Sequence, residues 1–179
     1  METSAPPARS ILSLDVGRRR IGLAGCDPLG VTVTPLPAIL RRHFDQDLNI
    51  IKAHCKKRAV KGLVVGMPLD RDGQPTQQAM HCQRYGQRLS RALQLPMALV
   101  NEQCSSWVAA EKGNMHGDRT GRLDSAAAVL LLDQWLREGP DLELDTSQRK
   151  DAARRSLMME PVHNNISLNE WTGNQQQQR

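Results

Sequence analysis

Three acidic residues of this sequence stand where an apolar segment ends or where a helix is expected to begin. Asp15 closes a short apolar run, Glu102 follows another, and Asp124 falls in the first turn of a segment with strong helical periodicity. Carboxylate oxygens suit hard divalent cations such as Mg²⁺. Each acid alone also fits a plain structural role, as a turn former, a solvated strand end or a favourable charge at a helix N-terminus. A shared chemical role therefore requires a fold that brings the three together.

Several arginines lie close to these acids in the sequence: Arg18, Arg19, Arg20 and Arg122. The guanidinium group pairs well with phosphate oxygens, so these side chains are candidates for positioning a phosphate backbone. The equally weighted alternative is that each is a solvated loop charge. Gly17 and Gly66 are interpreted as points where a backbone or a phosphate can come close, with helix packing as the alternative for Gly66. The lysine-rich segment at residues 52–61 is interpreted as a solvated helix face.

Composition narrows the class of protein. A chain of 179 residues fits one domain with a tail, and residues 1–138 hold 19 Lys and Arg against 13 Asp and Glu. This basic part suits a polyanionic partner, and the aromatic content of 3% disfavours a base-stacking platform. The sequence contains no apolar stretch of membrane-spanning length and no signal-peptide pattern, so a cytoplasmic protein without membrane contact is expected. The four cysteines are widely separated and are predicted to be reduced thiols.

The apolar periodicity predicts alternating strands and helices. Strands are expected at residues 11–15, 21–26, 31–34, 60–67 and 95–100, and helices at 47–58, 76–93 and 122–137, with a short helix after Ser105 and Ser106. The order β-β-β-α-β-α-β-α predicts an α/β domain with a mixed five-stranded sheet and helices on both faces, which is the RNase H-like arrangement. The domain is predicted to span residues 10–139, between a flexible leader at 1–9 and a flexible tail at 140–179.

Four segments in the same order resemble the YqgF family, also called RuvX. They are LDVGRRRIGLA at residues 14–24 with DPLG at 27–30, VVGMPL at 64–69 with Asp72-Gly73, PMALVNE at 96–102, and DSAAAVLLL at 124–132. The resemblance covers about residues 11–138. Members of this family are small RNase H-like proteins described as Holliday-junction resolvases and as pre-16S rRNA processing nucleases. The resemblance therefore implies an RNase H-like fold and hydrolysis of phosphodiester bonds.

The resemblance also assigns roles to individual residues. It implies that Asp15, Glu102 and Asp124 are the catalytic residues and the ligands of Mg²⁺ or Mn²⁺, which can clamp the attacking and leaving oxygens of a phosphodiester. The residues expected at the substrate are Gly17, Arg18, Arg20, Gly66, Ser105, Ser106 and Arg122. The family usually has Asp-Glu-Arg followed by Thr-Thr, whereas this chain has Asn101-Glu102-Gln103 and, after Cys104, two serines. One negative charge and one guanidinium are lost, while both hydroxyls are kept.

The expected activity is metal-dependent endonucleolytic cleavage, with structured precursor rRNA as the preferred substrate and branched DNA as the alternative. A Holliday-junction resolvase would need two active sites and hence a dimer, so the oligomeric state, monomer or homodimer, bears on this choice. A third hypothesis is a non-catalytic nucleic-acid-binding module, which the altered segment at residues 101–106 makes reasonable. The three retained carboxylates count against that hypothesis.

Overall fold

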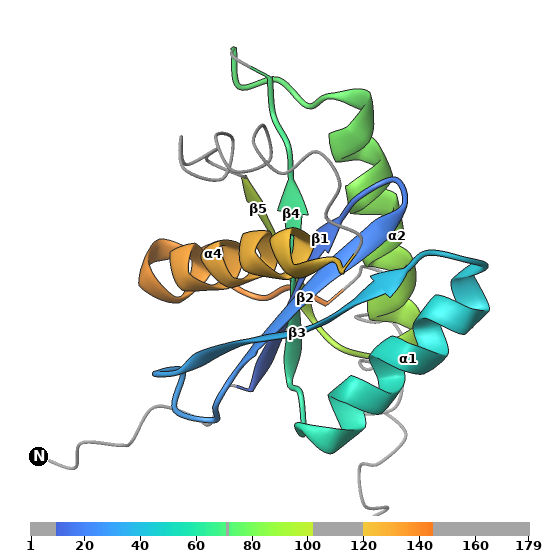
Figure 1. Cartoon of the computed structure of the whole chain (residues 1–179). Coiled ribbons are helices and arrows are strands. Elements are labelled where there is room, and N and C mark those ends of the chain that lie inside the picture. Colours follow the sequence, from blue (N-terminus) through green and yellow to red (C-terminus); the bar gives the residue numbers. More distant parts are fainter. Residues whose placement is uncertain (1–9, 71, 102–119, 145–179) are drawn as a thin grey trace, which may run out of the picture.

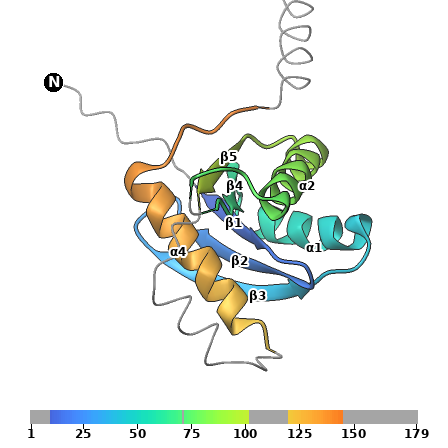
Figure 2. The same ribbon diagram turned by 90° about the horizontal axis from the view of Figure 1, so that it is seen from above.

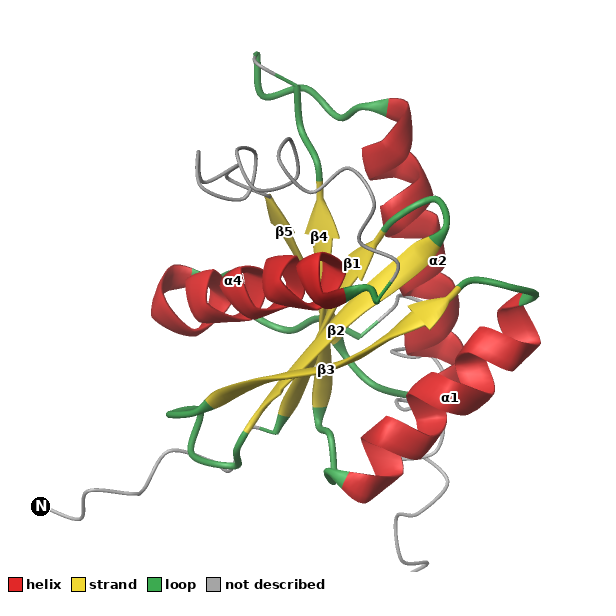
Figure 3. Cartoon of the chain, viewed as in Figure 1, coloured by secondary structure: helices red, strands yellow, loops and turns green. Residues whose placement is uncertain are grey.

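The computed structural model describes residues 10–70, 72–101 and 120–144, which form a three-layered α/β domain (Figures 1 and 3). Helix α4 covers one face of a central sheet, and α1 and α2 cover the other (Figure 2). The elements are β1 (Ile11–Val16), β2 (Arg20–Cys26), β3 (Val33–Leu40), α1 (Phe44–Lys57), β4 (Gly62–Met67), α2 (Gln77–Leu93), β5 (Met97–Asn101) and α4 (Arg122–Glu138). This is the order of elements predicted from the sequence.

The sheet has the strand order β3-β2-β1-β4-β5. The pairs β1/β2 and β2/β3 are antiparallel, and the pairs β1/β4 and β4/β5 are parallel. Strands β1 and β4 lie at the centre with a helical layer on each face, which explains why their sequences are nearly continuous apolar runs. The predicted mixed sheet of the RNase H-like fold, with helices on both faces, is confirmed.

Two hydrophobic clusters lie on opposite faces of the sheet, and β1 contributes side chains to both. Leu12, Leu14 and Val16 belong to the cluster beneath α1 and α2, whereas Ile11 belongs to the cluster beneath α4. Because side chains alternate along a strand, the odd-numbered residues of β1 face α4. The buried hydroxyl of Ser13 confirms this, since its Oγ donates a 2.7 Å hydrogen bond to the Ala128 carbonyl in α4.

Strand β3 differs from the sequence prediction. A strand was expected at residues 31–34, whereas β3 runs from Val33 to Leu40 and contains Pro35 and Pro37. Proline lacks a backbone N–H and is therefore confined to strands that have a partner on one side only. Strand β3 is the edge strand beside β2, so it can contain both prolines. In the sequence alone, these prolines disfavour a strand at residues 35–37.

Helix α1 begins earlier than expected, at Phe44 rather than at residue 47. The extra turn is held by tertiary contacts: the Phe44 ring packs edge-on against Tyr85 in α2 with centroids 5.6 Å apart, and Asp47 is buried. The Asp47 carboxylate accepts hydrogen bonds from the Tyr85 hydroxyl at 3.1 Å and from the backbone N–H of Arg42 at 3.1 Å. These partners lie outside the helix, which is why the amphipathic pattern did not reveal them.

The chain continues to pack against the sheet beyond α4. Glu143 and Met97 exchange two backbone hydrogen bonds of 2.9 Å, Trp135 Nε1 donates to the Pro140 carbonyl at 2.8 Å, and Leu142 packs on the cluster beneath α4. Residues 140–144 therefore lie against the domain, although its end was expected at residue 139. The remainder of the expected tail, 145–179, and the leader at 1–9 lie outside the described residues. No helix in the described part is long and apolar enough to cross a membrane.

Candidate functional site

Asp15 lies near the carboxyl end of β1, on the face of the sheet that α4 covers. It is half-buried and shares the odd-numbered face of β1 with Ser13, which is bonded to α4. In the antiparallel pair with β2, Asp15 stands directly opposite Gly22. Side chains of directly opposite residues project to the same face, so the carboxylate of Asp15 projects toward the layer that contains α4.

Gly22 lets α4 approach the sheet beside Asp15. A Cβ built on Gly22 would collide with the backbone carbonyl of Asp124 and lie 3.0 Å from the backbone nitrogen of Ser125. Any larger residue at position 22 would therefore push the first turn of α4 away from β2. Asp124 itself is half-buried in that turn, where a negative charge is favoured by the helix dipole. The backbone of Asp124 thus lies over Gly22, and Asp15 stands beside Gly22 in the adjacent strand.

The N-terminus of α4 also lies beside Arg20 of β2. The N-cap residue Gly121 has a φ of 77°, a left-handed conformation that glycine adopts readily. A Cβ at this position would lie 2.6 Å from the Ala38 Cβ, 3.4 Å from Arg20 Cδ and 3.7 Å from Asp124 Oδ2. The side chains of Arg20 and Asp124 therefore converge on Gly121. Of the predicted site residues, the structure brings together Asp15, Asp124 and Arg20.

The turn between β1 and β2 holds two other predicted residues. Gly17 donates its N–H to the carbonyl of Arg20 at 2.9 Å, and its carbonyl accepts a 2.8 Å hydrogen bond from Arg41 Nη1. Arg18 is exposed at the tip of this turn. Gly17 therefore closes the turn through its backbone, while Arg18 presents its charge to solvent.

Gly66 and Arg122 occupy the borders of the site. Gly66 is buried in β4 and follows Val65, the register partner of Leu14 in β1, so it lies beside Asp15 in the sheet. Arg122 is the first residue of α4 and is exposed. Glu102, Ser105 and Ser106 lie outside the described residues, as does the short helix expected after them. Among residues 10–70, 72–101 and 120–144, no three His, Cys, Asp or Glu side chains form a group that could hold a metal ion.

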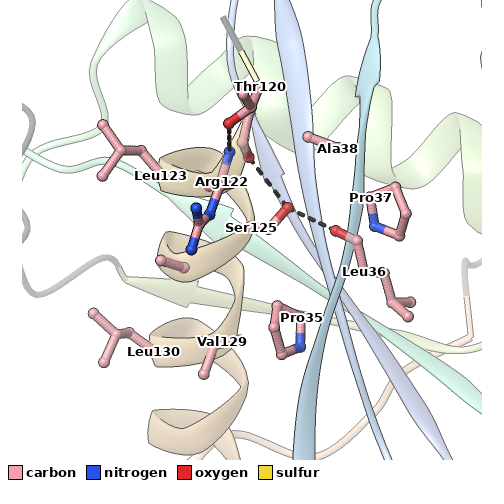
Figure 4. Close-up of a pocket in the computed structure, with 12 residues that line it drawn as sticks. Pro35, Leu36, Pro37, Ala38, Thr120, Arg122, Leu123, Ser125, Val129 and Leu130 are labelled. Atoms are coloured by element: carbon pink, nitrogen blue, oxygen red, sulfur yellow. Dashed lines mark hydrogen bonds between the residues drawn. The ribbon is translucent and has the colours of Figure 1, made fainter. Parts of the chain in front are cut away.

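An open apolar groove of about 830 Å³ lies between β3 and the first half of α4 (Figure 4). Its lining includes Pro35 and Pro37 from the strand and Val129 and Leu130 from the helix. Ser125 joins the two walls, because its Oγ donates a 2.7 Å hydrogen bond to the Leu36 carbonyl. Neither Asp15 nor Asp124 lines the groove, so the groove is separate from the meeting point of the two carboxylates.

A basic cluster beside the β1–β2 turn was not predicted from the sequence. Arg41 Nη1 lies 3.0 Å from Nε2 of His81 in α2, and its guanidinium lies 4.9 Å from the centroid of the Tyr85 ring. Partial burial, followed by the charges of Arg41 and Arg84, lowers the pKa of His81. At neutral pH the imidazole is therefore neutral, and its Nε2 can accept the hydrogen bond from Arg41. The spacing of the basic residues in α2 was visible in the sequence, but the position of this helix beside Gly17 was not.

Comparison with known proteins gives a consistent set of relatives. A family model described as "RuvX: Holliday junction resolvase" matches residues 9–138. A protein from Prochlorococcus marinus (strain MIT 9313) named "Putative pre-16S rRNA nuclease" is 64% identical over 143 residues, which cover 80% of this chain and 89% of that protein. A protein of the same name from Parasynechococcus marenigrum (strain WH8102) is 66% identical over 138 residues, covering 77% and 88%.

Similarity to solved structures is weaker. The RuvC of T. thermophilus in complex with a Holliday junction substrate aligns with a TM-score of 0.44 at 11% identity, covering 72% of this chain and 95% of that one. YeaZ from Pseudomonas aeruginosa aligns with a TM-score of 0.38 at 17% identity, covering 59% and 50%. Similarity at this level carries no information about activity.

Proposed function

Since this chain belongs to the RuvX family of nucleases, we propose that it is a divalent-metal-dependent endonuclease of the cytoplasm that processes the 5′ end of precursor 16S rRNA. Asp15, Asp124 and Glu102 are the proposed catalytic residues and metal ligands. The names of the relatives support the choice of substrate. The basic balance of the domain and its shortage of aromatic residues support a substrate that is held by its phosphates.

The observation that supports this proposal is the position of Asp15 and Asp124 around Gly22. Asp15 lies at the carboxyl end of a central strand opposite Gly22, and the first turn of the last described helix brings the backbone of Asp124 against the same glycine. Binding sites of α/β sheets gather at the carboxyl ends of strands. Glu102 joins the proposed set through its place in the sequence, directly after Asn101, the last residue of β5.

The donor set fits a hard divalent cation. Asp15 and Asp124 are both half-buried on the side of the sheet that faces α4, and carboxylates that converge without a bound cation repel each other. Mg²⁺ or Mn²⁺ held by these carboxylates would supply charge neutralisation at the scissile phosphate and acidify the attacking water. In this proposal the two aspartates would hold the cation through their carboxylate oxygens.

Arginines at the edge of the site position the substrate in this proposal. Arg18 at the tip of the β1–β2 turn and Arg122 in the first turn of α4 are exposed and are available to phosphates on either side of the carboxylates. Arg20 lies between them, beside Gly121. Gly17, Gly66, Ser105 and Ser106 complete the proposed substrate contacts; the two serines lie outside the described residues.

A Holliday-junction resolvase is the second candidate, favoured by the description of the matching family. A resolvase cuts two strands and therefore needs two active sites in one assembly. Sedimentation of the purified chain, measured in the same preparation as its cleavage of precursor rRNA and of a four-way DNA junction, separates the two candidates. A monomer that prefers the rRNA supports rRNA processing, whereas a dimer that prefers the junction contradicts it.

The catalytic assignment is tested with Asp15→Asn and Asp124→Asn, each assayed with Mg²⁺, with Mn²⁺ and with a chelator. Each variant is expected to lose cleavage by about 100-fold or more, because a carboxylate at the scissile phosphate is removed. Asp133→Asn is the matched control, since Asp133 is a half-buried aspartate of the same helix, and it should keep activity within about 2-fold. Cleavage that persists in the chelator, or that is undiminished in Asp15→Asn, contradicts the mechanism. Binding without cleavage under all conditions identifies a non-catalytic module.

A further inference from the structure

Helix α2 carries a histidine and three arginines along one exposed side. His81, Arg84, Arg88 and Arg91 follow one another at intervals of three, four and three residues, and all four are exposed. Residues three and four apart in a helix lie on the same side, so these side chains form one row, here called the α2 row. It extends about 15 Å along the helix axis.

The cations of the α2 row lack acids within their own helix. The segment Gln77–Leu93 contains no Asp or Glu, and of the two acids in the neighbouring α1, Asp47 is buried and bonded to Tyr85. Arg84 and Arg88 are four residues apart, a spacing at which like charges weaken a helix. The sequence of α2 therefore places arginines side by side without an acid in the same helix, as is common on a surface that binds an anion.

Two arginines of the row are held in place by protein contacts. Arg84 Nε donates a 3.3 Å hydrogen bond to the Met80 carbonyl, and the guanidinium of Arg88 lies over the Phe44 ring, 3.8 Å from its centroid. A restrained guanidinium loses less conformational freedom when it pairs with a phosphate. Both remain exposed, so their charged ends are accessible to a large ligand.

The α2 row begins at the end of the sheet where the catalytic aspartates are proposed to act. His81 contacts Arg41, which in turn donates to the carbonyl of Gly17 in the β1–β2 turn. Gly17 is two residues after Asp15, and the exposed Arg18 and Arg19 follow it. Contacts through Arg41 and His81 therefore connect the β1–β2 turn with the arginines of α2, on the side of the sheet opposite to α4.

From this continuity we infer that the α2 row binds the phosphate backbone of a double-stranded segment of the RNA substrate, beside the strand that enters the active site. This inference rests on the proposed nuclease function. Each strand of double-stranded DNA presents a phosphate about every 3.4 Å along its axis. On that scale the three arginines, which extend over about 10 Å of the helix, span roughly three phosphates. The described aromatic residues Phe44, Tyr85 and Trp135 are half-buried or buried, which favours a duplex held by its backbone over stacked single-stranded bases.

The test measures binding of a labelled RNA hairpin by the full chain in a chelator, so that no cleavage occurs. Fluorescence anisotropy gives the Kd at KCl concentrations from about 50 to about 300 mM. In this range the release of counterions makes the binding of phosphates strongly dependent on salt. The variant Arg84→Gln/Arg88→Gln is expected to raise the Kd about 10-fold at 100 mM KCl, a condition near physiological ionic strength. It should also make the slope of log K against log salt shallower by about 2, one for each lost phosphate contact.

The matched control is Lys52→Gln/Lys56→Gln, which removes two exposed positive charges four residues apart on α1. This control is expected to change the Kd by less than about 2-fold and to leave the salt slope unchanged. Equal effects of the two double variants would show that only net charge matters and would overturn the inference. An unchanged slope in Arg84→Gln/Arg88→Gln would also overturn it, as would tighter binding of a DNA hairpin of the same sequence.

Cleavage assays separate this inference from the proposed function. With Mg²⁺ present, Arg84→Gln/Arg88→Gln should raise KM and leave kcat within about 2-fold, because the row binds the substrate equally in the ground and transition states. Cleavage with a normal KM in this variant overturns the inference alone. Duplex binding that depends on the row, in a protein that never cleaves, overturns the proposed function alone. Circular dichroism checks that Arg84→Gln/Arg88→Gln is still folded, because this variant also loses the contact between Arg88 and the Phe44 ring.

Discussion

Gly22 in β2 packs directly against the backbone carbonyl of Asp124 in α4, and the space between them is too small for a side chain. The same glycine stands opposite Asp15 in the neighbouring strand. One position without a Cβ therefore sets how closely the backbone of α4 at Asp124 can pack on the sheet beside Asp15. The first turn of α4 is further held to β3 by the hydroxyl of Ser125, so this turn cannot shift freely to make room for a larger residue.

Gly22→Ala is accordingly expected to lower both stability and activity. Its Cβ must displace the backbone of α4, and such overpacking costs about 1–3 kcal/mol. Urea unfolding gives the free energy change, and rRNA cleavage gives the loss of kcat. Gly25→Ala in the same strand is the control, because its Cβ would meet the side chain of Arg58 rather than backbone, and that flexible side chain can move. Equal destabilisation by the two substitutions would contradict the role assigned to Gly22.

Tyr85→Phe is expected to destabilise the protein by about 1–3 kcal/mol, because the buried carboxylate of Asp47 loses a hydrogen-bond donor while the aromatic ring is kept. Burial and the negative charge of Asp47 raise the pKa of the Tyr85 phenol, so the hydroxyl stays protonated as the donor. A double-mutant cycle with Asp47→Asn, measured by urea unfolding at pH 7, isolates the pair. Strictly additive effects would rule out a direct interaction.

The pKa of His81 is expected to lie below its ordinary value of 6.5 and to rise in Arg41→Gln, because partial burial and the charges of Arg41 and Arg84 disfavour the imidazolium. The folded state therefore prefers the neutral ring. Its contribution to stability is complete above pH 6.5 and is lost as the pH falls through the lowered pKa. NMR titration of the imidazole measures the shift.

His54 serves as the internal control for that titration. Its pKa is lowered by burial and then by Arg58 and Lys57, so Arg41→Gln should leave it unchanged. A parallel rise of both histidines would indicate a general loss of structure rather than removal of one neighbouring charge.

Cys55 is expected to resist alkylation in the folded protein. Cys55 lies in α1, and burial of its side chain raises the pKa of the thiol to about 11. At pH 8 only about one molecule in a thousand therefore carries the reactive thiolate. Iodoacetamide labelling at pH 8 followed by peptide mass spectrometry should leave Cys55 unmodified over the time in which the urea-unfolded protein is fully labelled. Equal rates in the two states would show that this thiol is accessible.

The order of strands and helices was readable from the sequence, because the apolar periodicity of each segment reflects the faces that it buries. The segment from Leu95 to Val100 reads as a strand and the alanine-rich segment after Asp124 reads as a helix without knowledge of their neighbours. The differences in β3 and α1 both arose from neighbouring elements, as did the packing of residues 140–144 against β5. Pro35 and Pro37 fit β3 only because it is an edge strand, and α1 starts at Phe44 because Tyr85 packs against it.

The sequence by itself therefore determined the fold class and, through the resemblance of its motifs, which acids to consider. Only the tertiary structure decided that Asp15 and Asp124 share a face, that Gly22 sets their approach, and that the cations of α2 begin beside Gly17. Periodicity is a property of a few adjacent residues, whereas these relationships join segments that are far apart in the sequence, by 115 positions in the bond from Ser13 to Ala128. They arise from strand register and helix packing, which no local pattern encodes.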